Sequence, residues 1–165
     1  MHEHLAVATF DPRDADLPLA SMFAGWALAD EVQRRIAADG LDDLRMADGV
    51  VFQHLVPGPQ PIGELAARLG VSQQAASKSV ADLERRGYVR READPADGRT
   101  RRAALTARGE AAIAAGRRHR AAVEAELGER LGAERVEGAR RTLVDVLEAL
   151  GGTAAVRGRR VRPPA

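Results

Sequence analysis

The sequence of 165 residues contains no cysteine. Without thiols the chain cannot form disulfides, use a thiolate nucleophile or bind a metal through sulfur. It also lacks any apolar run near the roughly 20 residues that a membrane-spanning helix needs. Its first residues, MHEHLAVATFDPRDAD, have neither the basic start nor the long apolar segment of a secretory signal. We therefore expect a soluble, cytoplasmic protein with no membrane partner.

Aromatic residues and lysine are also scarce. Aromatics make up 3% of the chain, and Lys78 is the only lysine among 25 basic residues. The arginines are unevenly distributed: residues 1–60 hold 4 basic and 10 acidic residues (−6), whereas residues 84–120 hold 11 basic and 5 acidic (+6). The net charge of +1 therefore conceals a polarised molecule, as expected if one face meets a polyanion.

Helical periodicity and cap residues predict six helices. Gly40, Gly70 and Gly87 are typical of helix C-termini, and Ser72 and Thr106 are typical N-caps. We expect helices over residues 19–38, 42–55, 62–69, 73–86, 106–127 and 133–150.

A β-hairpin is predicted between the fourth and fifth of these helices. Residues 88–92 alternate as a strand does, DPADGRT supplies an Asp-Gly turn, and residues 101–105 form the return strand. The stretch RREADPADGRTRRAALT, residues 90–106, places five arginines on this hairpin. The expected fold class is mainly α with a small β-hairpin wing (α+β).

The segment LAARLGVSQQAASK has the residue types and spacing of a helix-turn-helix. Leu65, Leu69 and Val71 are apolar, and Gly70 lies in the tight turn. A second helix held by its apolar stripe presents its opposite face to the major groove of double-stranded DNA. Gln can pair with adenine, and Lys can reach guanine or a phosphate. The predicted contacts come from Ser72, Gln73, Gln74, Ser77 and Lys78.

The hairpin accounts for the local excess of arginine if it flanks the DNA. The minor groove has a negative potential that attracts arginine. Arg99 follows the Asp97-Gly98 turn and is predicted to enter this groove, with Asp97 bracing its guanidinium. On alternating strands only about half of the remaining arginines can face DNA. Those placed for phosphate contacts are Arg90, Arg91, Arg101 and Arg102.

The run ELAARLGVSQQAASKSVADLERRGYVRREADPADGRTRRAALTARG resembles the core of MarR-type (multiple antibiotic resistance regulator) winged helix-turn-helix transcription factors. D-P-x-D-G-R at residues 94–99 and Thr-x-x-Gly at residues 106–109 match the family's wing and the start of its next helix. The helix order extends the likeness over residues 19–150. Ala76 and Ser79 are smaller than the residues usual there, so the recognition helix is expected to lie close to the helix before it.

This resemblance implies a homodimer with N- and C-terminal dimerisation helices. It also implies a repressor that binds a pseudo-palindromic operator and that, in many members, is released by a small aromatic or anionic ligand. The same motif match assigns base and phosphate contacts to the helix residues named above and a minor-groove contact to Arg99. The expected organisation is an N-terminal arm (1–18), a helical dimerisation region (19–40 and 106–152), a DNA-binding winged helix-turn-helix domain (41–105) and a basic tail (153–165).

Two further features concern partners. Val136, Leu143 and Leu150 recur every seven residues and form a face that requires an apolar partner. The four arginines of residues 156–165 can add non-specific attraction to phosphates, or the tail can be an inert end.

An effector would occupy a cleft between the first two helices and the winged domain. The candidate residues are an aromatic, two thioethers, a histidine and a cation for an anionic ligand: Met22, Trp26, Arg45, Met46 and His54. The alternative interpretation places Met22, Trp26 and Met46 in the core or in a dimer seam. We expect no cofactor.

Three other classes of function fit the residues less well. The acidic pairs Asp42-Asp43 and Glu124/Glu126 do not share a helix face, and no nucleophile with its base or phosphate-binding loop is visible, so an enzyme is not expected. A metal site would need His54 or His119 with carboxylates, and none is assigned. A winged helix used for protein interaction, without operator specificity, remains the alternative. Such a module usually loses its basic wing, because desolvated arginines are costly.

Overall fold

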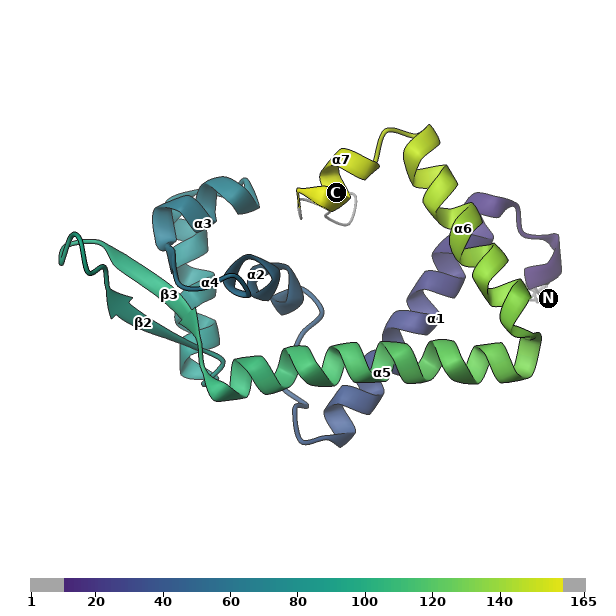
Figure 1. Ribbon diagram of the computed structural model, residues 1–165, viewed down its shortest axis with the longest axis horizontal. Coiled ribbons are helices and arrows are strands. Elements are labelled where there is room, and N and C mark those ends of the chain that lie inside the picture. Colours follow the sequence, from purple (N-terminus) through teal and green to yellow (C-terminus); the bar gives the residue numbers. More distant parts are fainter. Residues whose placement is uncertain (1–10, 159–165) are drawn as a thin grey trace, which may run out of the picture.

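The computed structural model describes residues 11–158 and shows a mainly helical chain with one small sheet (Figure 1). This arrangement confirms the predicted fold class and its order of elements. In chain order the elements are a 3-10 helix η1 (Pro12–Asp14), α1 (Leu17–Ala38), α2 (Asp48–Leu55), β1 (Gln60–Pro61), α3 (Ile62–Leu69), α4 (Gln73–Arg85), β2 (Val89–Ala93), β3 (Arg101–Leu105), α5 (Ala107–Leu131), α6 (Ala133–Ala149) and α7 (Thr153–Arg157).

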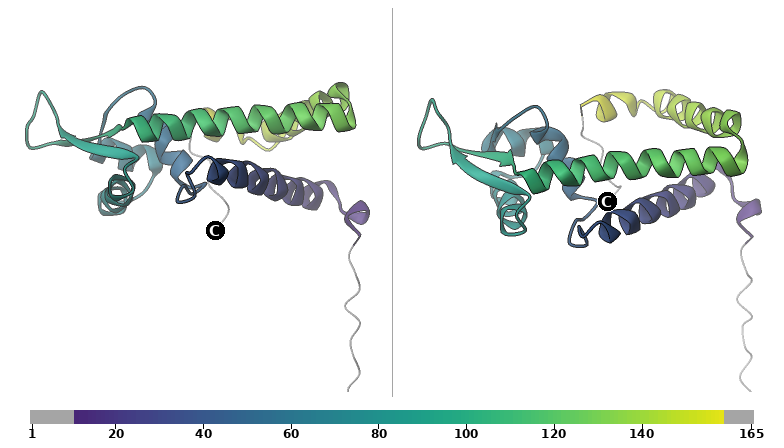
Figure 2. Two further views of the ribbon diagram at one scale, coloured as in Figure 1. Left: turned by 90° about the horizontal axis from the view of Figure 1, so that it is seen from below. Right: turned by 60° about the horizontal axis from the view of Figure 1, so that its bottom comes forward.

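The molecule is elongated, with the winged domain at one end and the long helices at the other. α2, α3, α4 and the sheet form the winged domain, and α5 runs from it to the opposite end (Figure 1). α1 and α6 both pack against α5, and Figure 2 shows them on different sides of it. α5 is therefore the element that connects the two parts.

Side-chain caps explain where the main helices begin. The Asp16 carboxylate accepts a hydrogen bond from the Leu19 N–H at 2.9 Å, and the Ser72 hydroxyl accepts one from the Ala75 N–H at 3.1 Å. These bonds satisfy donors that the first turn of a helix leaves unpaired. At the turn between α3 and α4, Gly70 has a φ of 59°, a left-handed conformation that glycine adopts without a Cβ clash.

The second helix begins later than its sequence predicts. Residues 42–43 and 46–47 form turns, and α2 starts only at Asp48. The Asp43 carboxylate accepts hydrogen bonds from the Tyr88 hydroxyl and the Arg108 guanidinium, so it does not cap a first helical turn. Arg45 and Met46, predicted on this helix, lie in the loop before it.

The sequence does not predict the 3-10 helix η1 or two further elements, β1 and α7. β1 has two residues and pairs antiparallel with β3, with Gln60 opposite Ala103, which makes β3 the central strand of a three-stranded sheet. The short helix α7 occupies the start of the predicted tail; it ends at Arg157. Arg159, Arg160 and Arg162 of the tail, and residues 1–10 of the N-terminal arm, lie outside the described residues.

The core lies mainly within the winged domain. Leu65, Val80 and Tyr88 are fully buried, and Phe52 packs against Tyr88 with ring centroids 5.8 Å apart. Ala66 and Ala76 are both buried where α3 packs against α4, so small residues allow these helices to approach closely. Ser79 is exposed, which explains why a polar residue is tolerated there.

Over residues 11–158, no helix is both long enough and apolar enough to cross a lipid bilayer.

Candidate nucleic-acid interface

The helix α4 has one buried face and one polar, exposed face. Ala76, Val80 and Leu83 are buried on one side. Spacings of three and four residues place these side chains along a single stripe of the helix. The predicted contact residues lie outside this stripe: Ser72, Gln73, Gln74 and Lys78 are exposed, and Ser77 is half-buried. The structure therefore brings all five to the N-terminal half of one helix.

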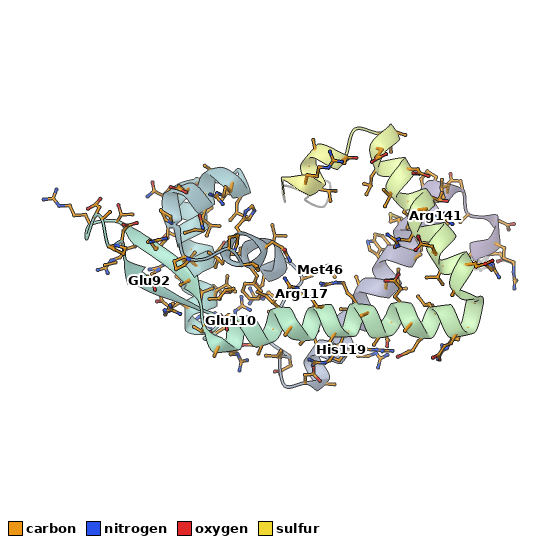
Figure 3. All side chains as sticks on the ribbon, in the orientation of Figure 1. Met46, Glu92, Glu110, Arg117, His119 and Arg141 are labelled. Carbon is orange, nitrogen blue, oxygen red and sulfur yellow. The ribbon has the colours of Figure 1, made fainter. Side chains whose placement is uncertain are left out.

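The wing is an antiparallel hairpin whose register assigns its arginines to two faces. Arg91 lies opposite Ala103, and Glu92 lies opposite Arg102. Cross-strand partners point to the same side of a sheet, and successive residues point to opposite sides. Arg91 therefore shares a face with buried Ala103, whereas Arg102 lies on the other face with Glu92, which Figure 3 labels on the wing.

Asp97 shapes the wing turn instead of bracing the side chain of Arg99. Its carboxylate accepts hydrogen bonds from the Arg99 backbone N–H at 3.0 Å and from the Thr100 hydroxyl at 2.9 Å. These bonds, the backbone one first, lower the pKa of Asp97. The predicted brace was wrong because the carboxylate of an Asp-Gly turn meets nearby backbone donors first. The Arg99 residue itself is exposed next to the turn.

The other wing arginines differ in their surroundings. The Arg90 guanidinium donates to the Leu105 carbonyl at 2.6 Å and lies 3.2 Å from the Glu92 carboxylate. The Arg102 guanidinium donates to the Pro59 carbonyl at 2.6 Å and lies 3.7 Å from the Asp94 carboxylate. Arg101 is exposed. Arg90 and Arg102 thus hold the wing together, which sequence alone did not indicate.

The structure also contains a charged cluster at the end of α4 that the sequence does not predict. The Arg86 guanidinium donates to the Asp48 carboxylate, to the Asp82 carboxylate at 2.8 Å and to the Asp43 carbonyl at 2.8 Å. Arg86 and Arg108 also lie over the ring of Tyr88, at 5.6 and 4.7 Å from its centroid. This cluster joins the C-terminal end of α4 to the loop before α2 and to α5. The only sequence signal for this cluster is the Arg85-Arg86 pair at the end of α4. Such a pair is also typical of solvent-exposed basic residues in the last turn of a helix.

The predicted effector residues lie on three different elements. Met22 and Trp26 are on α1, where their side chains are 39% and 62% exposed. Arg45 pairs with Asp82 at 3.3 Å, and His54 is buried on α2. Met46 is 61% exposed in the loop before α2, where Figure 3 labels it. These exposures show that Met22, Trp26 and Met46 do not lie in the core of a single chain, which was one of the alternatives.

The histidines considered for metal binding have different surroundings. His119 lies on α5, with its Nε2 atom 2.7 Å from the Asp39 carboxylate, whereas His54 is buried on α2. Within residues 11–158, no three His, Asp or Glu side chains gather as metal ligands would.

The helices α1 and α6 carry apolar side chains that one chain leaves uncovered. α6 contains no buried residue over its 17 positions. Its exposed apolar residues, with those of α1, are Leu17, Leu19, Met22, Phe23, Trp26, Leu28, Leu143, Val144 and Leu147. Contiguous exposed apolar surface is typical of an interface.

Comparison with known proteins agrees with this geometry. A sequence profile described as MarR family matches residues 51–100. A MarR family protein of Mycobacterium tuberculosis, solved in complex with salicylic acid, is 30% identical; the match covers 81% of this chain and 97% of that one, with a TM-score of 0.55. Among curated proteins no sequence match was found.

Two further solved structures share the fold. YusO from Bacillus subtilis is 20% identical over 86% of this chain and 99% of its own, with a TM-score of 0.66. A mutant of S. aureus MepR bound to an oligodeoxyribonucleotide is 18% identical over 83% of this chain and 99% of its own, with a TM-score of 0.62. With the helix-turn-helix, the wing and the 30% identical relative in agreement, the chain belongs to the MarR family of winged helix-turn-helix transcription regulators.

Proposed function

We propose that the protein represses transcription by binding, as a homodimer, a pseudo-palindromic operator in double-stranded DNA. The observation that carries this proposal is the pairing of two exposed features: the polar N-terminal half of α4 and the arginine-bearing wing beside it. A helix of this kind reads base edges in the major groove while a basic wing follows the backbone. The MepR structure of the same fold, which is bound to an oligodeoxyribonucleotide, supports DNA as the partner.

The DNA contacts are divided between the helix and the wing. Ser72, Gln73, Gln74, Ser77 and Lys78 face the major groove, where glutamine and lysine distinguish bases. Arg99 enters the minor groove and Arg101 meets phosphate, because both are exposed. Arg90, Asp97 and Arg102 support these contacts by shaping the wing, and Arg90, with its side chain 57% exposed, can also reach phosphate.

The dimer is formed by residues 19–40 and 106–152, and residues 41–105 bind DNA. The uncovered apolar faces of α1 and α6 support this division, because a 17-residue helix without a buried residue gains little from folding alone. Two copies of α4 then meet half-sites about 10 bp apart on one face of B-DNA. Residues 1–18 and 153–165 flank these units.

A small aromatic anion is the proposed effector. The salicylic acid complex of the 30% identical relative supports this ligand class. The candidate residues are Met22 and Trp26 on α1, Arg45 and Met46 in the loop before α2, and His54 on α2, and the ligand is proposed to bind between α1 and the winged domain. A ligand wedged there changes the spacing of the two α4 helices, and thermodynamic reciprocity requires that operator DNA weaken the ligand by the same factor.

The test is selection of bound fragments from a genomic pool, followed by fluorescence anisotropy on the best fragment and on a scrambled copy. We expect an enriched pseudo-palindrome that the protein binds far more tightly than the scrambled copy at physiological salt. Gln73→Ala with Gln74→Ala should abolish this preference and leave dimer mass unchanged. Equal binding to both DNAs, or to neither, would contradict the proposal and favour a protein-interaction module without operator specificity.

A further inference from the structure

Arg91 lies on the face of the wing that packs toward α4. It sits on β2, an edge strand of the sheet, opposite the fully buried Ala103. Its side chain is only 30% exposed, although arginine on an edge strand normally extends into water. The surroundings of this guanidinium therefore differ from those of Arg101 on the neighbouring strand, which is exposed.

Arg91 is attached to α4 at two points. Its guanidinium Nη2 donates to the backbone carbonyl of Ser77 at 2.8 Å. Its backbone N–H donates to the Glu84 carboxylate at 3.1 Å, and its Nε lies 3.5 Å from the other oxygen of that carboxylate. Ser77 and Glu84 are seven residues apart, about two helical turns. A carbonyl oxygen has two lone pairs, so that of Ser77 can accept this bond in addition to a helical one.

These contacts hold the side of α4 that its apolar stripe does not. Ala76, Val80 and Leu83 attach the helix to the core, and Arg91 with Glu84 attaches it to the wing. Rotation of α4 about its own axis would break one of the two attachments. Base reading tolerates only small errors of position, of about 0.5 Å and 10–20°. Ser77, whose carbonyl Arg91 holds, is among the residues proposed to face DNA.

We propose that Arg91 is a positioning residue for operator recognition: it acts on the orientation of α4 relative to the wing and not on phosphate. This inference rests on the proposed function as an operator-binding regulator. It separates Arg91 from the exposed wing arginines, to which its sequence position alone would assign it. Glu84 takes part in the same positioning, because it accepts a hydrogen bond from the Arg91 backbone and forms an ion pair with the Arg91 guanidinium.

The experiment compares Arg91→Ala and Arg91→Lys with the matched control Arg101→Ala. Affinities are measured for the selected operator and for a scrambled copy over a range of salt concentrations. Both Arg91 variants should bind the operator about tenfold more weakly, the effect of losing a good base contact, and bind scrambled DNA as before. Lysine keeps the positive charge but lacks the planar guanidinium with its several N–H donors, so Arg91→Lys should not restore operator binding. Arg101→Ala should weaken binding to both DNAs. It should also reduce the dependence of affinity on salt concentration by the amount expected for about one phosphate contact.

A second variant, Glu84→Ala, separates positioning from simple electrostatics. Removing a negative charge beside DNA should strengthen binding to every sequence if charge alone matters. The positioning role instead requires weaker operator binding with unchanged dimer mass. The inference is overturned if Arg91→Ala weakens both DNAs equally while Arg91→Lys restores them, or if Arg91→Ala or Glu84→Ala leaves operator affinity intact. A wild-type protein with no preferred sequence would instead refute the proposed function.

Discussion

The Arg86 guanidinium and the Asp48 carboxylate are joined by two hydrogen bonds of 2.7 and 2.9 Å, with side chains only 7% and 11% exposed. This bidentate pair links the end of α4 to the start of α2, across 38 residues of sequence. The hydrogen bonds to Asp48 are also the main reason that the pKa of Arg86 lies above its ordinary value, so the arginine stays charged. The winged domain is thus held by a charged contact as well as by its apolar core.

Removing one partner of the Arg86–Asp48 pair should lower the free energy of unfolding substantially. Arg86→Met leaves the Asp48 carboxylate buried without its main cation, and we expect unfolding free energy to fall by about 3 kcal/mol. Asp48→Asn should cost a similar amount. Combining the two changes should cost clearly less than their sum, because the double variant leaves no unpaired charge. Urea denaturation of the four proteins provides this cycle, and strictly additive losses would contradict it.

Gly109 is required by a close approach of two backbones. A Cβ atom at this position would lie 2.2 Å from the Tyr88 carbonyl oxygen, an atom that cannot move aside as a side chain can. Gly109→Ala should therefore lower stability by about 1–3 kcal/mol, even though alanine favours a helix. Gly63→Ala, at a glycine that is also in the first turn of a helix, is the matched control, since nothing lies within 4 Å of its added Cβ. Its melting temperature should stay near that of the wild type, whereas Gly109→Ala should melt earlier.

Stability should decrease in acid partly through Asp43. Hydrogen bonds from the Tyr88 hydroxyl first, and then from the Arg108 guanidinium, lower the pKa of Asp43. A carboxyl group with a lowered pKa in the folded state stabilises the fold above its unfolded pKa of about 3.9, and this stabilisation is lost as pH falls through the folded pKa. Asp43→Asn should therefore lose less stability than the wild type between pH 6 and pH 3. Urea midpoints at both pH values measure this, with the exposed neighbour Asp42→Asn as the control; equal drops in all three proteins would refute it.

Arg99→Ala should weaken operator binding without affecting the fold. The residue is exposed at the wing turn, so its removal should alter stability by less than about 0.5 kcal/mol. Asp97→Ala should also weaken binding, although it removes a negative charge, because it deletes the two bonds that shape the turn. Anisotropy with the selected operator measures both effects. Full affinity of Arg99→Ala at physiological salt would show that the wing tip does not enter the groove.

The apolar face of α6 should determine the oligomeric state. Sedimentation of the wild type should give about twice the chain mass of 17.6 kDa. Leu143 and Leu147 are 46% and 43% exposed in one chain. Replacing both with glutamate (Leu143→Glu with Leu147→Glu) places two charges on this apolar face and should produce monomers. Arg141→Glu, a charge change at an exposed position of the same helix, is the control. A wild-type monomer, or a dimer that survives the double change, would exclude this face as the seam.

Much of the fold could be predicted because its signals are local. Ser72 and Thr106 cap helices with their own side chains, whose hydroxyl oxygens accept hydrogen bonds from N–H groups only three residues further along the chain. The Asp97 turn is likewise closed by bonds within three residues. Periodic apolar residues placed the helix-turn-helix and the polar face of α4. The sequence therefore sufficed to predict the order of the six main helices and the hairpin, the fold class and the membership of the family.

What only the tertiary structure decided depends on residues far apart in the chain. Alternation along the strands predicts only that about half of the wing arginines can face DNA, whereas the contacts of Arg91 with Ser77 and Glu84 show that this arginine packs against α4. The Arg86–Asp48 pair, the two-residue strand β1 and the late start of α2 have the same origin. Each arises because a charged or backbone group pairs with a distant partner when the core closes, and no local pattern in the sequence specifies that partner.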